Sequence, residues 1–259
     1  MLFRKLIRLV LVVIISLVIS VDEGRAETLD INVMVDIAGS QCMLTQRMFR
    51  DCGLIGLGVT YKDPVQDLDS VVKRFDRQLK QLQTNSVNDA VSAAFDKVEK
   101  LWQQIEPAVL ENPEKSKAVA LRNELEKLLK ASHQAVLRLQ EASGEIGAEV
   151  VNISGRQMML SQRMAALYML HFWDLSEGDF LTEIRSIVKE FRKAHNYLFV
   201  SEKTTPAIRK KLNQAAKYFR CFETAAAKKT SRVTPELIQR NSDLLLEKMH
   251  EITGEYTYE

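Results

Sequence analysis

The chain has only three cysteines in 259 residues, at positions 42, 52 and 221. An odd number cannot form a complete set of disulfides, so the fold does not depend on a disulfide framework. Cys42 and Cys52 fall on one predicted helix, about 15 Å apart along its axis at ~1.5 Å per residue, which is too far for a disulfide. A bond from Cys221 to either one stays open, but buried free thiols are the simpler interpretation.

Proline and glycine are also scarce, with five and ten residues, and no stretch alternates Val, Ile and Thr as a half-buried strand would. The sequence therefore predicts an all-α fold: a tandem duplicated up-down helical bundle of about seven to eight helices after an N-terminal signal segment. Four helices are expected in the first half, over residues 28–57, 64–82, around 91–105, and from about 113 with a buried face over 121–139. In the second half the expected helices reach 174, then cover 177–200, 205–228 and the chain from 234.

Local signals mark several of the helix ends. Asp63-Pro64 and Asn112-Pro113 each read as an N-cap followed by proline in the first turn, and Pro107 should end or kink the third helix. Gly144 favours a turn over one continuous helix. Residues 254–259 are expected to fray.

Long apolar runs are absent except near the N-terminus, where basic residues precede an apolar stretch over 9–21 and small residues flank Arg25. This pattern predicts a signal peptide over residues 1–26 and export to the periplasm. The run is short for a membrane span, which needs about 20 residues; an uncleaved segment that tethers the protein to the membrane is the alternative. Removing four basic and two acidic residues with this segment, from totals of 36 and 34, leaves 32 of each. A neutral chain gives no electrostatic case for nucleic acid as a partner.

One twelve-residue motif occurs twice. It reads IAGSQCMLTQRM at residues 37–48 and ISGRQMMLSQRM at residues 153–164, with eight identical positions. Residues 70–75 match 186–191 at the same spacing of 116, and the spacing grows to 117 and 118 farther along, as small loop insertions would produce. We therefore predict three segments: a signal peptide over 1–26, a first helical repeat over 27–143 and a second over 144–259.

The motif brings together small, thioether, amide and guanidinium groups on one side of a helix. Glycine permits close backbone approach, methionine packs adaptably, and arginine offers a planar fork for an anion. The candidate ligand-binding residues are Gly39, Met43, Gln46, Arg47, Gly155, Arg156, Met159, Gln162 and Arg163. If the motif helices face each other, Arg47 and Arg163 could approach one anion. The competing interpretation is that the motifs only pack helices together.

Other chemistry finds little support in the sequence. The four histidines, at positions 133, 171, 195 and 250, share no metal-ligand spacing with cysteines or carboxylates. The sequence has no nucleophile elbow, phosphate loop or haem-attachment motif. We therefore expect no enzyme activity, no cofactor and no metal site.

The two motifs resemble the signature of the PilJ/NarX-like sensor domain, found at the N-terminus of type IV pilus methyl-accepting chemotaxis transducers and in nitrate/nitrite sensor kinases. The resemblance implies an all-helical extracytoplasmic bundle that senses a ligand at the motif helices. In the nitrate sensors an arginine three residues after the motif glycine contacts the anion. Here Cys42 and Met158 occupy that position, so the resemblance favours a small anion without specifying nitrate.

The leading hypothesis is accordingly an extracytoplasmic ligand-binding sensory component for a small, nitrate- or nitrite-like anion. Those sensors pass their signal to a membrane helix and a signalling module, so a membrane-bound receptor or kinase is the expected partner here. The alternative is a structural or protein-interaction module without a small ligand, its motifs serving as packing or homodimer seams.

Overall fold

The computed structural model describes residues 29–144, 146–175, 180–227 and 233–258; the predicted signal peptide, residues 1–26, lies outside them. The described residues form eight helices and no strand, which confirms the all-α prediction. The helices are α2 (Ile31–Gly56), α3 (Pro64–Thr84), α4 (Asp89–Leu110), α5 (Lys115–Ser143), α6 (Ile146–Phe172), α7 (Phe180–Val200), α8 (Pro206–Ala227) and α9 (Pro235–Tyr258).

Side-chain caps explain where several helices begin. The carboxylate of Asp63 accepts a hydrogen bond from the Gln66 amide, and Pro64 opens α3, as predicted. Asn88 caps α4 in the same way. The expected Asn112 cap is wrong, because Glu114 occupies the N-cap of α5 without a side-chain hydrogen bond.

Two helix ends differ from expectation. Of the predicted end or kink at Pro107, the end is wrong, because α4 continues to Leu110 and fully buries Val109 beyond the proline. The expected fraying from residue 254 does not occur before Tyr258, because Ile252 and Tyr256 are buried against the bundle. A hydrogen bond from the Thr257 hydroxyl to the Thr253 carbonyl further stabilises this last part of α9.

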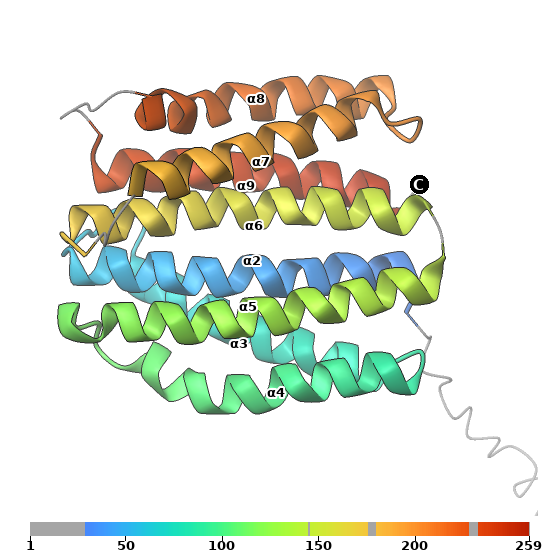
Figure 1. Cartoon of the computed structure of the whole chain (residues 1–259), viewed down its shortest axis with the longest axis horizontal. Helices are drawn as coiled ribbons and strands as arrows, with labels where there is room; N and C mark the ends of the chain where they lie inside the picture. Colours follow the sequence, from blue (N-terminus) through green and yellow to red (C-terminus); the bar gives the residue numbers. More distant parts are fainter. Residues whose placement is uncertain (1–28, 145, 176–179, 228–232, 259) are drawn as a thin grey trace, which may run out of the picture.

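Successive helices run in alternating directions along a common axis (Figure 1). The chain reverses after α5 at Gly144, whose φ of 65° is the left-handed conformation that glycine adopts without a steric penalty. This confirms the predicted turn. It also means that α2 and α6, which carry the motifs, run in the same direction.

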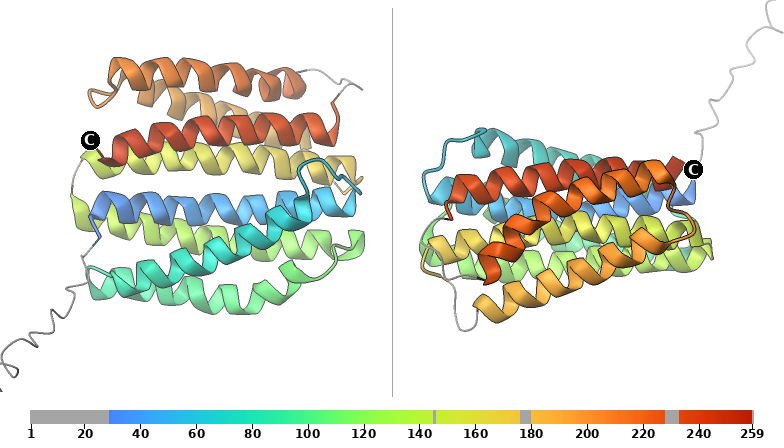
Figure 2. Two further views of the ribbon diagram at one scale, coloured as in Figure 1. Left: turned by 180° about the vertical axis from the view of Figure 1, so that it is seen from behind. Right: turned by 90° about the horizontal axis from the view of Figure 1, so that it is seen from above.

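The two motif helices lie side by side at the centre of the bundle, as opposite views agree (Figure 2), and their contact is the most extensive between any two described helices. Equivalent positions face each other. A Cβ built on Gly39 would lie 3.7 Å from the Cα of Gly155, and one built on Gly53 would meet Met169, again 116 residues away. The motifs therefore form a parallel, in-register seam.

The remaining helices repeat around this seam. Helix α2 packs on α3 and α5, while α6 packs on α7 and α9. In both repeats a buried motif glutamine donates to a backbone carbonyl 34 residues later, Gln41 to Phe75 at 2.9 Å and Gln157 to Phe191 at 2.8 Å. The division into repeats at residue 143 stays a prediction.

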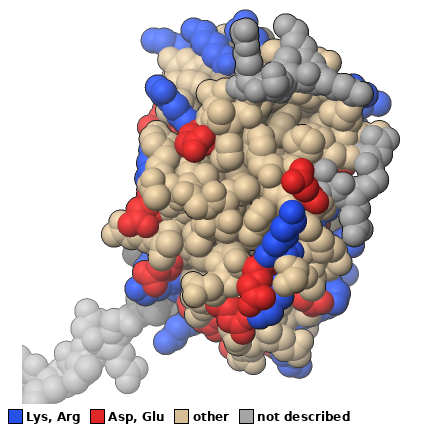
Figure 3. Space-filling view, turned by 90° about the vertical axis from the view of Figure 1, so that its left-hand side faces the viewer, with Lys and Arg blue, Asp and Glu red and all other residues tan. Residues whose placement is uncertain are grey.

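One end of the bundle lies where α2 ends and α9 begins. Viewed from there, the surface is largely uncharged, with acidic and basic side chains scattered and more frequent in its lower half (Figure 3). The candidate site lies away from this end, along the α2–α6 seam.

Candidate functional site

The two motif arginines do not meet at one point. The guanidinium of Arg47 donates two hydrogen bonds to Asp67 on α3, from Nε at 3.0 Å and from Nη2 at 2.6 Å. Arg163 instead lies near Glu126 on α5 and Glu183 on α7, with Nη2 at 3.2 and 3.7 Å from their carboxylate oxygens. The arginines line separate pockets, so the common anion point is not formed.

The first pocket, which we call the α5 pocket, has a volume of about 230 Å3 between α5 and the two motif helices. Four predicted site residues line it, together with seven that the prediction did not include. The lining residues are Gly39, Cys42, Glu126, Leu129, Lys130, His133, Val136, Asn152, Arg156, Met159 and Arg163.

Three cationic side chains and one carboxylate line the α5 pocket, and two of the cations are paired with carboxylates. Arg156 pairs with Glu190 and approaches the ring of His133, while Lys130 forms no ion pair within 4.0 Å with the described residues. Arg163 has a buried Nε–H that finds no acceptor in the described part of the chain. A buried donor without a partner is costly, so an acceptor entering this pocket would relieve that cost.

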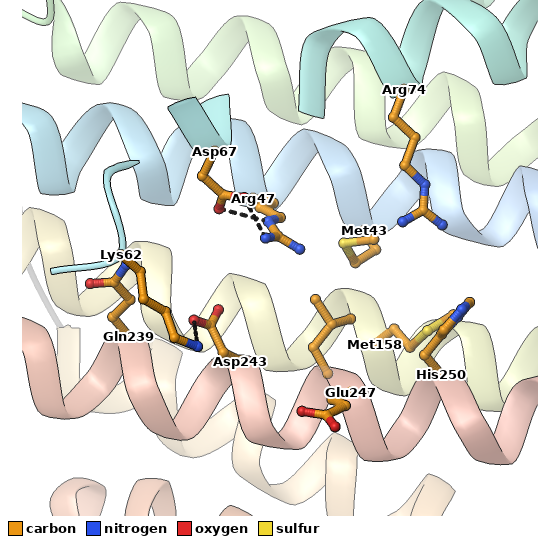
Figure 4. Close-up of a pocket in the computed structure, with 11 residues that line it drawn as sticks. Met43, Arg47, Lys62, Asp67, Arg74, Met158, Gln239, Asp243, Glu247 and His250 are labelled. Atoms are coloured by element: carbon orange, nitrogen blue, oxygen red, sulfur yellow. Dashed lines mark hydrogen bonds and ion pairs between the residues drawn. The ribbon is translucent and has the colours of Figure 1, made fainter. Parts of the chain in front are cut away.

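The second pocket, the α9 pocket, has a volume of about 300 Å3 and lies between α2, α3, α6 and α9 (Figure 4). Two predicted site residues, Met43 and Arg47, line it. The other lining residues are Lys62, Asp67, Arg74, Met158, Gln239, Asp243, Leu246, Glu247 and His250.

The repeat relates these pockets to each other. Met43 and Arg47 in one pocket correspond to Met159 and Arg163 in the other, 116 residues later. In the nitrate sensors, an arginine lies three residues after the motif glycine. The residues at that position here are Met158 of the second motif, which lines the α9 pocket, and Cys42 of the first motif, which lines the α5 pocket. Burial raises the pKa of the Cys42 thiol to about 12, so this side chain is a neutral thiol.

A histidine also lines each pocket, His133 in one and His250 in the other. Neither was assigned a binding role from the sequence, because the histidines share no metal-ligand spacing with cysteines or carboxylates. Their separation of 117 residues is a spacing already present in the repeat, and it could have identified them as equivalent.

The other three predicted site residues do not line either pocket. Gly155 packs against Gly39 at the seam. Gln46 donates to Glu126 at 3.2 Å, and Gln162 donates to the Ser242 carbonyl at 3.2 Å. Both glutamines are buried. Whether any of the nine binds a ligand stays a prediction.

A buried charge network beside the motifs was not predicted. Arg50 is fully buried and donates to Asp51, Asp67, Asp243 and Gln162, which joins α2, α3, α6 and α9. Desolvation raises the pKa of the buried Asp51 carboxyl to about 7 despite its hydrogen bonds from Arg50. The sequence could have indicated this network, because the second repeat has the apolar residues Ala166 and Leu167 at the positions of the charged pair Arg50 and Asp51.

The described residues contain no group of three or more His, Cys, Asp or Glu side chains arranged to hold a metal ion. None of the helices in this part of the chain has the length and apolar character needed to cross a membrane.

Comparison with known proteins finds a similar family over part of the chain. Residues 29–132 match the PilJ family, described as the N-terminal region of type IV pili methyl-accepting chemotaxis transducers. No curated protein and no solved structure matches the chain. The family match confirms the resemblance over this range, which contains the first motif and helices α2 to α4. The matched family is sensory and non-enzymatic.

Proposed function

Since residues 29–132 match the PilJ family, we propose that the chain is an extracytoplasmic sensory component that binds a small anion in the α5 pocket and signals through a membrane-bound partner. The observation that carries this proposal is the unpartnered, buried Nε–H of Arg163. The pocket it lines has three cationic side chains and one carboxylate. A small oxyanion such as nitrate or nitrite supplies the missing acceptor.

The expected affinity follows from the number of available donors. Each charge-assisted hydrogen bond contributes about 1.5–3 kcal/mol, so two bonds from Arg163 and a neighbouring cation give roughly 3–6 kcal/mol before ordering costs. This range corresponds to dissociation constants from millimolar to tens of micromolar. Such weak binding suits a sensor of an abundant ion.

The position of the pocket supports a signalling role. It is bordered by both motif helices and by α5, so a bound anion contacts the seam on which both repeats pack. A ligand that prefers one arrangement of that seam shifts its population. The signal then reaches a membrane receptor or kinase partner, or the membrane itself if residues 1–26 are retained.

Isothermal titration calorimetry with nitrate, nitrite and small carboxylates tests this proposal. We expect binding by the unaltered protein and loss of at least ten-fold in affinity in Arg163→Gln. Arg47→Gln is the matched control, because it removes the equivalent arginine from the α9 pocket and should leave the anion affinity unchanged. Equal losses in both variants would contradict the assignment to the α5 pocket.

The second candidate, an interaction module without a small ligand, is favoured by the Gly39–Gly155 contact and by the local pairing of Arg47 and Arg163 with carboxylates. The two motif helices, however, already pack against each other within one chain. A homodimer would therefore need another surface. Absence of heat with every anion tested at millimolar concentration would support this candidate.

A further inference from the structure

The α9 pocket differs from its counterpart by an exchange of charges between repeats. In the second repeat, Arg156 on the motif helix is neutralised by Glu190 on α7. The equivalent positions in the first repeat are Ser40 and Arg74, so the carboxylate has become an arginine and the arginine a serine. Arg74 donates to the Ser40 hydroxyl at 3.3 Å and has no ion pair within 4.0 Å among the described residues.

Most of the other charged side chains of the α9 pocket form ion pairs. Arg47 pairs with Asp67 at 2.6 Å and Lys62 with Asp243 at 3.3 Å, and the buried Arg50 pairs with both aspartates. Of the lining residues this leaves one cation, Arg74, and one carboxylate, Glu247, without an ion-pair partner in the described part of the chain. The nearby Asp36 attracts Arg74 but forms no ion pair with it within 4.0 Å.

These two charged side chains belong to different walls of the pocket. Figure 4 shows Arg74 reaching in from α3, and Glu247 and His250 on α9, with Met43 and Met158 between them. Arg74 is half-buried, whereas Glu247 lies at the exposed rim. At the 117-residue spacing of His133 and His250, Leu246 corresponds to Leu129 of the α5 pocket, and Glu247 corresponds to Lys130. A volume of about 300 Å3 lies at the lower end of the range for small-molecule sites.

A simple anion would satisfy Arg74 and be repelled by Glu247, while a simple cation would do the reverse. We infer that the α9 pocket binds a small zwitterion, an α-amino acid with an apolar side chain, with its carboxylate at Arg74 and its ammonium group at Glu247. The methionines and Leu246 would contact the apolar side chain, since thioethers adapt to irregular shapes. This site is separate from the anion site proposed in the α5 pocket.

Calorimetric titration of the protein with L-alanine, L-valine, L-leucine and L-methionine tests the inference. For L-leucine, 4-methylpentanoate lacks only the ammonium group and 3-methylbutylamine lacks only the carboxylate. We expect at least one amino acid to bind at least ten-fold more tightly than either of its two analogues. Equal binding of the carboxylate analogue would overturn the inference in favour of a plain anion site, and no binding by any of the four amino acids would also overturn it.

Two variants locate the site. Arg74→Gln and Glu247→Gln should each weaken amino-acid binding at least ten-fold, and Glu247→Gln should bring the amino acid to the affinity of its carboxylate analogue. Neither side chain forms an ion pair in the described structure, so both variants should keep the far-ultraviolet circular dichroism of the unaltered protein. Arg163→Gln should abolish oxyanion binding without changing amino-acid affinity. Loss of amino-acid binding only in Arg163→Gln would place the ligand in the α5 pocket and refute the inference.

Discussion

Two glycines on the α2–α6 seam should respond in opposite ways to the same substitution. A Cβ added at Gly39 would lie 3.7 Å from its nearest neighbour, the Cα of Gly155, which is ordinary van der Waals contact. A Cβ added at Gly53 would lie 2.5 Å from the Cβ of Met169. Neither glycine has a positive φ, so alanine is compatible with the backbone at both positions.

The expected magnitudes follow from two opposing effects. Replacing an interior helical glycine by alanine stabilises a helix by about 0.5–1 kcal/mol, and forcing extra volume into a packed contact costs about 1–3 kcal/mol. Gly39→Ala should therefore raise the free energy of unfolding by about 0.5–1 kcal/mol. Gly53→Ala should be less stable than Gly39→Ala by about 1–3 kcal/mol, because the helix-propensity gain cancels in this comparison.

Urea unfolding of the two variants and the unaltered protein measures this difference directly. For a domain of this size, each kcal/mol should also shift the melting temperature by about 2–4 °C. Equal stability of the variants, or a lower stability for Gly39→Ala, would refute the parallel, in-register seam.

Three further predictions concern buried polar groups. Because burial raises the pKa of Asp51 to about 7, the folded state holds its proton more tightly than the unfolded state; the stability that this contributes is present at low pH and is lost as pH rises through 7. The stability of the unaltered protein relative to Asp51→Asn, measured by urea unfolding at pH 4 to 8, should thus fall with rising pH, and a flat difference would contradict this. Gln157→Ala should destabilise the protein by about 1–3 kcal/mol through loss of its buried hydrogen bond to Phe191, and calorimetric melting with no loss would argue against that contact. Alkylation of the native protein at pH 8 should modify Cys221 first, because Cys42 and Cys52 are buried and their thiol pKa values are raised to about 12; mass spectrometry would reveal the opposite order.

Much of the fold follows from local signals in the sequence. The Asp63 cap and the left-handed Gly144 act within a few residues, so their effects can be read without tertiary structure. The helix does not end at Pro107 because burial of Val109 outweighs the lost backbone donor. Residues 254–258 likewise stay helical because Tyr256 is buried by tertiary contacts.

The site was harder to predict than the fold. The repeated motif indicated which helices matter, but the separation of Arg47 and Arg163 depends on carboxylates from other helices, Asp67 and Glu126. The partners of Arg74 and Arg156 could be compared only after the structure placed α3 and α7 against the motif helices. The buried Arg50 network was visible in the sequence as a charge pair with no counterpart in the second repeat, yet its partners lie on three other helices.

Anion-dependent stabilisation of the protein tests the central proposal most directly. Melting curves should be recorded with nitrate, nitrite, other oxyanions and small carboxylates, against chloride at matched ionic strength. At 100 times its dissociation constant, a specific anion should add about 2.7 kcal/mol of stability, and this gain should persist in Arg47→Gln and vanish in Arg163→Gln. Identical melting in every anion, or a gain that survives Arg163→Gln, would contradict the proposed sensor site.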